Sequence, residues 1–280
     1  MTSDNSFPFI SCGMYAFTDD LQFAWQSLFT LFADLTEPGY RLDPTLLFDT
    51  DESTLWDSRL FIGHTCGYPF MKNLQDALSP VCIPIFDVAG CEGKLYSSAF
   101  ITSLDNDIES LTDCYQRVAA INGRESNSGM NVLRHAIAPL SQDQDINKSN
   151  NKAFFSDVIE SGSHRQSLIE VGAGRADIAA IDCVSLALMT DAWPELAARI
   201  RVIGYSAKTC GLPFVMPNAR FDSIYPGTIT LYLNQALVKL PQALRQRLHL
   251  QSFVDTQLGD YQRILDLEAQ AHDAGYPNLV

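Results

Sequence analysis

The segment Ser126-Asn127-Ser128-Gly129 is the most specific chemical feature of the sequence. It follows an apolar stretch and opens a predicted helix, so it places two hydroxyls beside the unpaired backbone N–H groups of the first helical turn. Gly129 has no side chain, which lets a bound group approach the backbone closely. Donors of this kind, at the positive end of a helix dipole, suit an oxyanion. The segment is equally consistent with a plain N-cap at Ser126.

A second segment, Ser161-Gly162-Ser163-His164, also leads from a loop into a predicted helix. His164 could donate a hydrogen bond to an anion, although a lone histidine is more often structural. Asp182 directly follows an apolar strand and could face a ligand cleft. Capping the helix that begins there is the slightly preferred role for Asp182.

Three tyrosines lie at the predicted ends and crossings of strands. Tyr15 ends the first predicted strand, Tyr68 follows His64-Thr65-Cys66-Gly67, and Tyr96 lies in a long extended run. A tyrosine offers a ring wall and a hydroxyl, which suits a small polar ligand. Each of the three is also compatible with ordinary packing.

The sequence lacks the motifs of several enzyme and cofactor classes. It contains no HExxH, GxGxxG, P-loop or GxSxG motif, so no cofactor is expected. Its five histidines are dispersed, and its seven cysteines form no CxxC pair, so no metal site is expected either. Most cysteines are predicted to be buried thiols. One disulfide is permitted, and Cys66 with Cys91 is the expected pair because both lie in predicted loops of the same lobe.

Strands and helices alternate along the chain, which predicts an α/β fold with a mostly parallel sheet. Thr18 is predicted to cap the first helix, whose apolar residues are spaced four and three apart. Apolar runs predict strands at 7–12, 60–63, 81–86, 115–121, 176–181 and 200–203. Further helices are predicted from about 127, from 182 through 188, at 226–238 and at 256–272.

The length of 280 residues suggests two lobes. Two extended runs, Leu95 to Thr102 and Tyr205 to Val215, are predicted to cross between them. Residues 1–98 and 207–280 then form lobe 1, and residues 99–206 form lobe 2. Two crossings make a hinge, with a ligand cleft between the lobes and near the carboxyl ends of strands.

The net charge of -14 argues against nucleic acid and anionic membranes as partners. No apolar stretch approaches the roughly 20 residues of a membrane span. The first basic residue is Arg41, so the apolar run near the N-terminus does not resemble a signal peptide. The expected location is therefore cytoplasmic for the sequence as written, or periplasmic if a leader was removed.

Taken together, these segments resemble a known family in their order along the chain from about residue 10 to 216. The matching segments are Gly13-Met14-Tyr15, Thr65-Cys66-Gly67-Tyr68-Pro69, Tyr96-Ser97-Ser98, Ala120-Ile121-Asn122 with Ser126-Asn127-Ser128-Gly129, Ser161-Gly162-Ser163-His164, Ala176 to Asp182, and Gly211-Leu212-Pro213-Phe214. The chain resembles the phosphonate, phosphite and phosphate solute-binding proteins of ABC importers. That resemblance implies the type 2 periplasmic-binding-protein fold, with mixed sheets flanked by helices and two crossover hinge strands.

The resemblance also implies roles for individual residues. Ser126, Asn127 and Ser128 would form the oxyanion cradle, and Tyr96 and His164 would close it. Tyr15 and Tyr68 would line the ligand cleft from the other lobe. Asp182 lies near the position at which some family members carry an acid that contacts the amine of the ligand.

Two departures from the family pattern bear on the ligand. Leu212 stands where aminophosphonate binders carry an acid, which favours a smaller or more apolar oxyanion. Asn127 replaces a threonine and removes one hydroxyl from the cradle.

The leading hypothesis is a monomeric solute-binding protein for a small phosphorus oxyanion, with an ABC permease as its partner and without catalysis. The alternative is a cytoplasmic enzyme of the same fold that acts on a small carboxylate, with Asp182 and His164 as acid and base. A sensory domain is a third hypothesis, but two lobes leave no room for an attached signalling segment.

Overall fold

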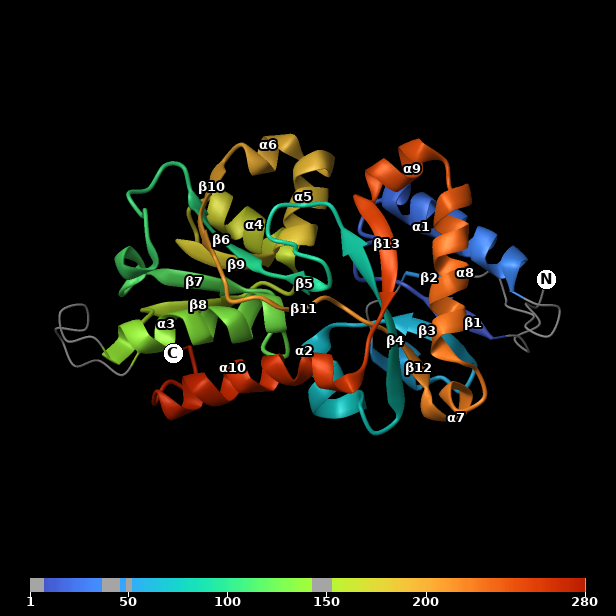
Figure 1. Cartoon of the computed structure of the whole chain (residues 1–280). Helices are drawn as coiled ribbons and strands as arrows, with labels where there is room; N and C mark the ends of the chain where they lie inside the picture. Colours follow the sequence, from blue (N-terminus) through green and yellow to red (C-terminus); the bar gives the residue numbers. More distant parts are fainter. Residues whose placement is uncertain (1–7, 37–45, 49–51, 143–152, 280) are drawn as a thin grey trace. The chain divides into compact units, whose positions relative to one another are not determined.

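The computed structural model describes residues 8–36, 46–48, 52–142 and 153–279. The chain divides into two units, each assembled from two segments of the sequence (Figure 1). Unit 1 comprises Met1–Asp87 and Gly211–Tyr261, and unit 2 comprises Val88–Cys210 and Gln262–Val280. No helix in the described ranges has the length and apolar character needed to cross a membrane.

Unit 1 contains a six-stranded sheet in the order β13-β4-β12-β3-β1-β2. Its strands are β1 (Phe9–Ser11), β2 (Leu46–Leu47), β3 (Leu60–His64), β4 (Leu78–Phe86), β12 (Phe214–Pro217) and β13 (Leu250–Asp255). The helices of this unit are α1 (Asp19–Leu35), α2 (Gly67–Pro69), α7 (Asn218–Phe221), α8 (Pro226–Lys239) and α9 (Gln242–Arg247), with short η1 (Glu52–Trp56), η2 (Phe70–Leu74) and η5 (Leu258–Tyr261). Helices α1 and α8 pack against each other (Figure 1).

Helix α1 confirms the prediction made from its sequence. The Thr18 hydroxyl caps it by accepting a hydrogen bond from the backbone N–H of Leu21 at 3.4 Å. The apolar spacing of the helix buries one stripe of side chains against the sheet, because residues three and four apart share a helix face. That stripe consists of Leu21, Ala24, Trp25, Leu28, Phe29 and Phe32.

Unit 2 contains a five-stranded sheet in the order β10-β6-β9-β7-β8, and a separate two-stranded sheet of β5 and β11. Its strands are β5 (Leu95–Tyr96), β6 (Ser98–Ser103), β7 (Val118–Ile121), β8 (Asp157–Glu160), β9 (Ile178–Asp182), β10 (Ile200–Tyr205) and β11 (Thr209–Cys210). Its helical elements are η3 (Leu111–Cys114), η4 (Asn127–Asn131), α3 (Val132–Gln142), α4 (His164–Gly172), α5 (Cys183–Ala192), α6 (Pro194–Ala197) and α10 (Gln262–Asp273).

The prediction of mostly parallel sheets is wrong. In unit 1, β12 runs antiparallel to both β3 and β4, and β13 runs antiparallel to β4. In unit 2, β6 is antiparallel to β9 and β10, while β7, β8 and β9 are parallel. Strands buried on both faces are apolar throughout in either direction, so their sequences do not reveal which way they run. The expected mixed, helix-flanked α/β class describes the structure.

The expected lobe boundaries also differ from the structure. The expected first crossing, Leu95 to Thr102, lies wholly within unit 2, because β5 pairs with β11 there. The C-terminal residues from Gln262 onward, expected in lobe 1, belong to unit 2. Helix α10 packs along α3 (Figure 1). Leu267 and Ala271 of this helix join the core of unit 2, as do Tyr276 and Leu279 in the segment that follows it.

All seven cysteines are free thiols. The expected pairing of Cys66 with Cys91 rested on both lying in one lobe, but Cys66 belongs to unit 1 and Cys91 to unit 2. The sulfur that contacts Cys91 Sγ is instead that of Cys183, at 3.6 Å.

Candidate functional site

The three parallel strands of unit 2 bring three of the predicted segments to one edge of the sheet. Strands β8 and β9 both run parallel to β7 on its two sides. The Ser126–Gly129 segment follows β7, the Ser161–His164 segment follows β8, and Asp182 ends β9. Because parallel strands end at the same edge, residues some 60 positions apart in the sequence become neighbours.

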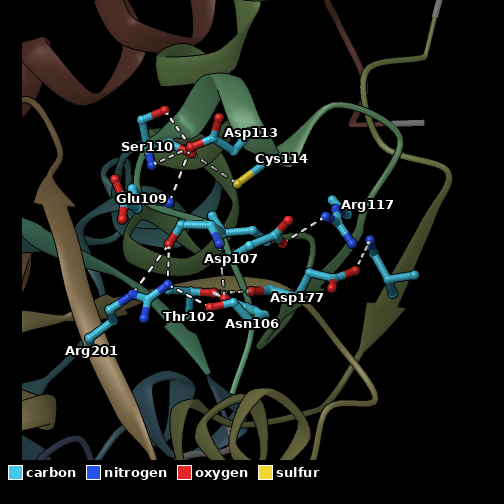
Figure 2. Close-up of polar contacts among 12 residues, drawn as sticks. Thr102, Asn106, Asp107, Glu109, Ser110, Asp113, Cys114, Arg117, Asp177 and Arg201 are labelled. Carbon is cyan, nitrogen blue, oxygen red and sulfur yellow. Dashed lines mark hydrogen bonds and ion pairs between the residues drawn. The ribbon is translucent and has the colours of Figure 1, made fainter. Parts of the chain in front are cut away.

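A polar network at the opposite ends of these strands fixes their register (Figure 2). One carboxylate oxygen of Asp177, just before β9, accepts a hydrogen bond from the backbone N–H of Val118 at 2.8 Å. The hydroxyl of Thr102, in β6, donates to the Asp177 carbonyl at 2.9 Å. Strands β6, β7 and β9 are thereby joined at one end, which determines where their other ends deliver the candidate residues.

The polar loop from Ser103 to Asp113 belongs to the same network (Figure 2). The Arg201 guanidinium donates to the backbone carbonyls of Asn106 and Ile108 at 2.8 and 2.7 Å. Ser110 is the N-cap of the short η3 helix, and the carboxylate of Asp113 completes its capping box by accepting from the backbone N–H of Ser110 at 2.9 Å. These acidic and polar groups therefore order the loop.

Ser126 is the N-cap of η4, which is one of the two roles that the sequence allowed for it. Its hydroxyl accepts a hydrogen bond from the backbone N–H of Gly129 at 3.0 Å. A Cβ at position 129 would lie 1.8 Å from Oδ1 of Asn122, so this position has room only for glycine unless Asn122 moves. Close packing against Asn122 is therefore a reason for Gly129 that the sequence did not suggest.

The side chain of Asn127 is fully buried and committed to protein partners. Its Nδ2 donates to the Tyr96 hydroxyl at 3.1 Å and to the Thr209 hydroxyl at 3.0 Å. Its Oδ1 accepts from Nδ2 of Asn131 at 3.1 Å. The Asn127 amide thus fixes Tyr96 and the β5–β11 pair relative to the helix start, a positioning role that the predicted oxyanion cradle did not include.

The network continues into the C-terminal helix through residues that sequence reasoning missed. Nδ2 of Asn131 also donates to the Ile264 carbonyl at 3.0 Å, and Oδ1 of Asn131 accepts from Arg134 at 2.8 Å. The buried Arg134 side chain donates to the Pro277 carbonyl at 2.9 Å and lies 3.6 Å from the Glu268 carboxylate. The i, i+4 spacing of Asn127 and Asn131 was the available signal, since such pairs share a helix face.

Two of the predicted site residues, Ser128 and His164, are in direct contact. Ser128 Oγ and His164 Nε2 lie 2.8 Å apart in a hydrogen bond. Burial lowers the pKa of His164 from 6.5 to about 4, so the imidazole is neutral at neutral pH. A neutral imidazole carries one N–H, and the Ser128 hydroxyl can both donate and accept. The pair therefore offers hydrogen bonds to a polar ligand without a fixed positive charge.

Contacts in the loop before His164 fix the start of α4. Ser163 caps α4 through a hydrogen bond from the backbone N–H of Gln166 at 3.1 Å. Gly162 has a φ of +86°, a conformation that side-chain-bearing residues rarely adopt. The Ser161 hydroxyl donates to the Ile121 carbonyl at 2.9 Å, which ties this loop to the end of β7.

Asp182 takes the capping role that the sequence slightly favoured. One carboxylate oxygen accepts from the backbone N–H groups of Val184 at 2.7 Å and Ser185 at 3.2 Å. Its side chain is buried, with 2% of the residue exposed. Asp182 therefore anchors the start of α5, and a role as catalytic acid or base has no support in these contacts.

Tyr15 and Tyr68 belong to unit 1, and the other seven predicted site residues belong to unit 2. Both rings are buried. Tyr15 makes edge contacts with His64 and Phe86, with ring centroids 5.3 and 5.2 Å apart. The Lys72 ammonium lies 5.7 Å from the ring centre of Tyr68. These contacts give each tyrosine a packing role within its own unit.

Within the described part of the chain, no group of three or more histidine, cysteine, aspartate or glutamate side chains is arranged to hold a metal ion.

Comparison with known proteins assigns the fold. A P. aeruginosa binding protein component of an ABC phosphonate transporter matches with a TM-score of 0.72 and 16% identity, over 96% of this chain and 87% of that one. PhnD1 from Prochlorococcus marinus, solved with methylphosphonate, matches with a TM-score of 0.68 and 12% identity, over 95% and 98%. The aliphatic sulphonate binding protein SsuA from Escherichia coli matches with a TM-score of 0.60 and 11% identity, over 98% and 89%. The fold is that of the type 2 periplasmic binding proteins.

No curated protein matches the sequence. A family model, described as ABC transporter, phosphonate, periplasmic substrate-binding protein, matches residues 55–261. The members of this family are substrate-binding proteins and not enzymes, which removes the enzyme alternative. Since the match spans well over half of the sequence, the chain belongs to the family of periplasmic substrate-binding proteins of phosphonate ABC transporters.

Proposed function

We propose that this protein binds a small phosphorus oxyanion, with an alkylphosphonate as the leading ligand, and delivers it in the periplasm to an ABC permease. The observation that carries the proposal is the hydroxyl-rich start of η4, where Ser126 caps the helix and Ser128 is hydrogen-bonded to His164. Hydroxyls and helix-start N–H groups bind an anion by donation and need no arginine. Such a site is compatible with a chain whose net charge is -14.

In this proposal Ser126, Ser128 and His164 donate hydrogen bonds to the ligand. The contacts that support it are the Ser126 cap of η4, the Ser128–His164 hydrogen bond and the Asn127 amide that holds Tyr96. Tyr15, Tyr68 and Asp182 stay predictions as ligand contacts. The two lobes expected to close on the ligand are also part of this proposal.

The chemistry at Leu212 refines the ligand class. Leu212 is apolar and buried where the resemblance places an acid in aminophosphonate binders. Without that acid, the ammonium of 2-aminoethylphosphonate has no partner at this position, and desolvating an unpaired charge is costly. We expect methylphosphonate to bind more tightly than 2-aminoethylphosphonate.

A thermal-shift screen followed by isothermal titration calorimetry tests the proposal. The panel contains phosphate, phosphite, methylphosphonate, 2-aminoethylphosphonate, sulfate, methanesulfonate and small carboxylates. A ligand at 100-fold excess over its Kd adds about 2.7 kcal/mol, which raises Tm by several degrees in a chain of this size. Methanesulfonate belongs in the panel because the sulphonate binder SsuA shares the fold.

The double variant Ser126→Ala/Ser128→Ala locates the site. Each lost hydrogen bond to a charged group costs about 1.5–3 kcal/mol, so affinity should fall roughly 10²- to 10⁴-fold. The matched control is Ser27→Ala/Ser223→Ala, which removes two exposed hydroxyls from unit 1 that bond only nearby carbonyls. Equal affinity of both double variants would contradict the cradle, and a response to carboxylates alone would contradict the ligand class.

A further inference from the structure

Two thiols that the proposed function does not use face each other in unit 2. Sγ of Cys91 and Sγ of Cys183 lie 3.6 Å apart, although 92 residues separate them in sequence. Cys183 is buried, and Cys91 is partly exposed. The other five cysteines are Cys12, Cys66, Cys82, Cys114 and Cys210.

The backbone holds both cysteines at this contact through one residue, Ser97. The carbonyl of Gly90 accepts from the Ser97 backbone N–H at 3.1 Å and from the Ser97 hydroxyl at 3.0 Å. The carbonyl of Ser97 accepts from the backbone N–H of Cys183 at 3.1 Å. The residue before Cys91 and the residue Cys183 itself are therefore hydrogen-bonded to the same position.

The packing leaves little room for the turn that carries Cys91 to move away from Cys183. A Cβ built at Gly90 would lie 2.8 Å from Cβ and 3.1 Å from Sγ of Cys183. The turn that carries Cys91 is closed by a further hydrogen bond, from the Cys91 backbone N–H to the Val88 carbonyl at 3.1 Å. A disulfide needs the two sulfurs at about 2.05 Å, and side-chain rotation over a preformed backbone supplies the remaining approach.

We propose that Cys91 and Cys183 are a disulfide site, which closes when the protein meets an oxidised low-molecular-weight thiol such as glutathione disulfide. The bridge would tie the turn at residues 88–91 to the start of α5, inside unit 2. The proposal does not rest on the proposed ligand.

The chemistry is two successive thiol–disulfide exchanges. The partly exposed Cys91 thiolate attacks one sulfur of glutathione disulfide, forms a mixed disulfide and releases one glutathione thiolate. Cys183 then loses its proton and attacks Sγ of Cys91, which breaks the mixed disulfide and releases the second glutathione thiolate. Both protons from the protein thiols end on the two glutathiones, which gain the two electrons that the cysteines lose. Cys183 is placed for the second step because its Sγ already lies 3.6 Å from Sγ of Cys91.

Such a bridge would persist in an oxidising compartment and open in a reducing one. It would cross-link a loop of about 90 residues in the unfolded chain, and cross-links of that span stabilise proteins mainly by restricting the unfolded state. We expect the oxidised protein to melt on the order of 5–10 °C above the reduced protein.

Peptide mapping of the full chain tests the site directly. The protein is equilibrated with glutathione disulfide, its free thiols are alkylated, and it is digested with a protease that cuts before aspartate. Digestion yields Asp87 to Leu104 and Asp182 to Thr190, which each contain one cysteine. The expected result is a cross-linked pair of these peptides, two hydrogens lighter than their sum, with the rise in Tm that reductant reverses.

Single variants provide the controls. Cys91→Ser and Cys183→Ser should each abolish the cross-linked peptide and the rise in Tm, whereas Cys66→Ser, which removes another partly exposed thiol, should retain both. Alkylation of Cys91 and Cys183 after equilibration would overturn the proposal. A persistent mixed disulfide with glutathione, or a bridge from Cys91 to any other cysteine, would overturn it as well.

Discussion

At the scale of the residue, Asn127 shows how a predicted ligand group becomes a structural one. A side-chain amide has two donor hydrogens and one carbonyl oxygen, and all three functions are occupied by Tyr96, Thr209 and Asn131. Asn127 is therefore a rigid link between the start of η4, Tyr96 and Thr209.

Replacing Asn127 with alanine should destabilise unit 2 by about 2–4 kcal/mol, because buried polar partners lose their hydrogen bonds. Urea unfolding of Asn127→Ala, Thr209→Val and the double variant forms a double-mutant cycle. The expected coupling energy is about 0.5–1.5 kcal/mol, since the two side chains share a hydrogen bond. A coupling energy of zero would mean that this bond contributes nothing to stability.

At the scale of the element, the candidate residues are placed by three helix starts at one edge of the unit 2 sheet. Ser126, Ser163 and Asp182 each cap one of them, for η4, α4 and α5. Capping residues satisfy backbone N–H groups and also fix where the first turn points. The side chains that cap these three helices therefore also determine the geometry of the candidate site.

Asp182 allows its capping role to be separated from a ligand role. Asp182→Ala should lower the stability of the protein by about 1–2 kcal/mol, because two backbone N–H groups lose their acceptor. Asp182→Asn should retain most of the stability, since asparagine caps about as well as aspartate. Chemical denaturation of both variants measures this difference. Comparable losses in the two variants would show that the charge of Asp182, and not its hydrogen bonds, stabilises α5.

At the scale of the whole molecule, His64 and His164 make stability depend on pH. Burial lowers the pKa of His64 from 6.5 to about 3 and that of His164 to about 4. Below about pH 6.5 the unfolded chain binds protons at these positions that the folded chain does not bind. The free energy of unfolding therefore falls as the pH drops from about 6.5 toward 4, by up to about 1.4 kcal/mol per pH unit for each group.

The variant His64→Phe should reduce the slope of the unfolding free energy against pH by the contribution of one proton. Its ring can replace that of His64, which stacks on Phe214 with centroids 4.4 Å apart. Denaturant unfolding between pH 7 and pH 4 measures the slope, and His272→Gln, at an exposed position of α10, is the control. Identical slopes for His64→Phe and the unaltered protein would contradict the assignment of His64 as a buried neutral group.

The amino-acid sequence by itself determined the local elements and the identity of the helix starts. The capped helix at Thr18, the Ser126 cap and the Asp182 cap follow from side chains that bond to backbone groups within three residues. The order of the segments also carried the family resemblance, which the family match confirms. These features depend on neighbours in sequence, and one chain is enough to reveal them.

The tertiary structure alone decided the features that join distant segments. It set the antiparallel strands β12 and β13, the place of α10 in unit 2, and the contact of Cys91 with Cys183. Strand direction and helix placement depend on which apolar faces meet, and many faces in the sequence are equally apolar. The hydrogen bonds from Asn127 to Thr209 and from Asn131 to Ile264 likewise span 82 and 133 residues, so no local sequence pattern predicts them.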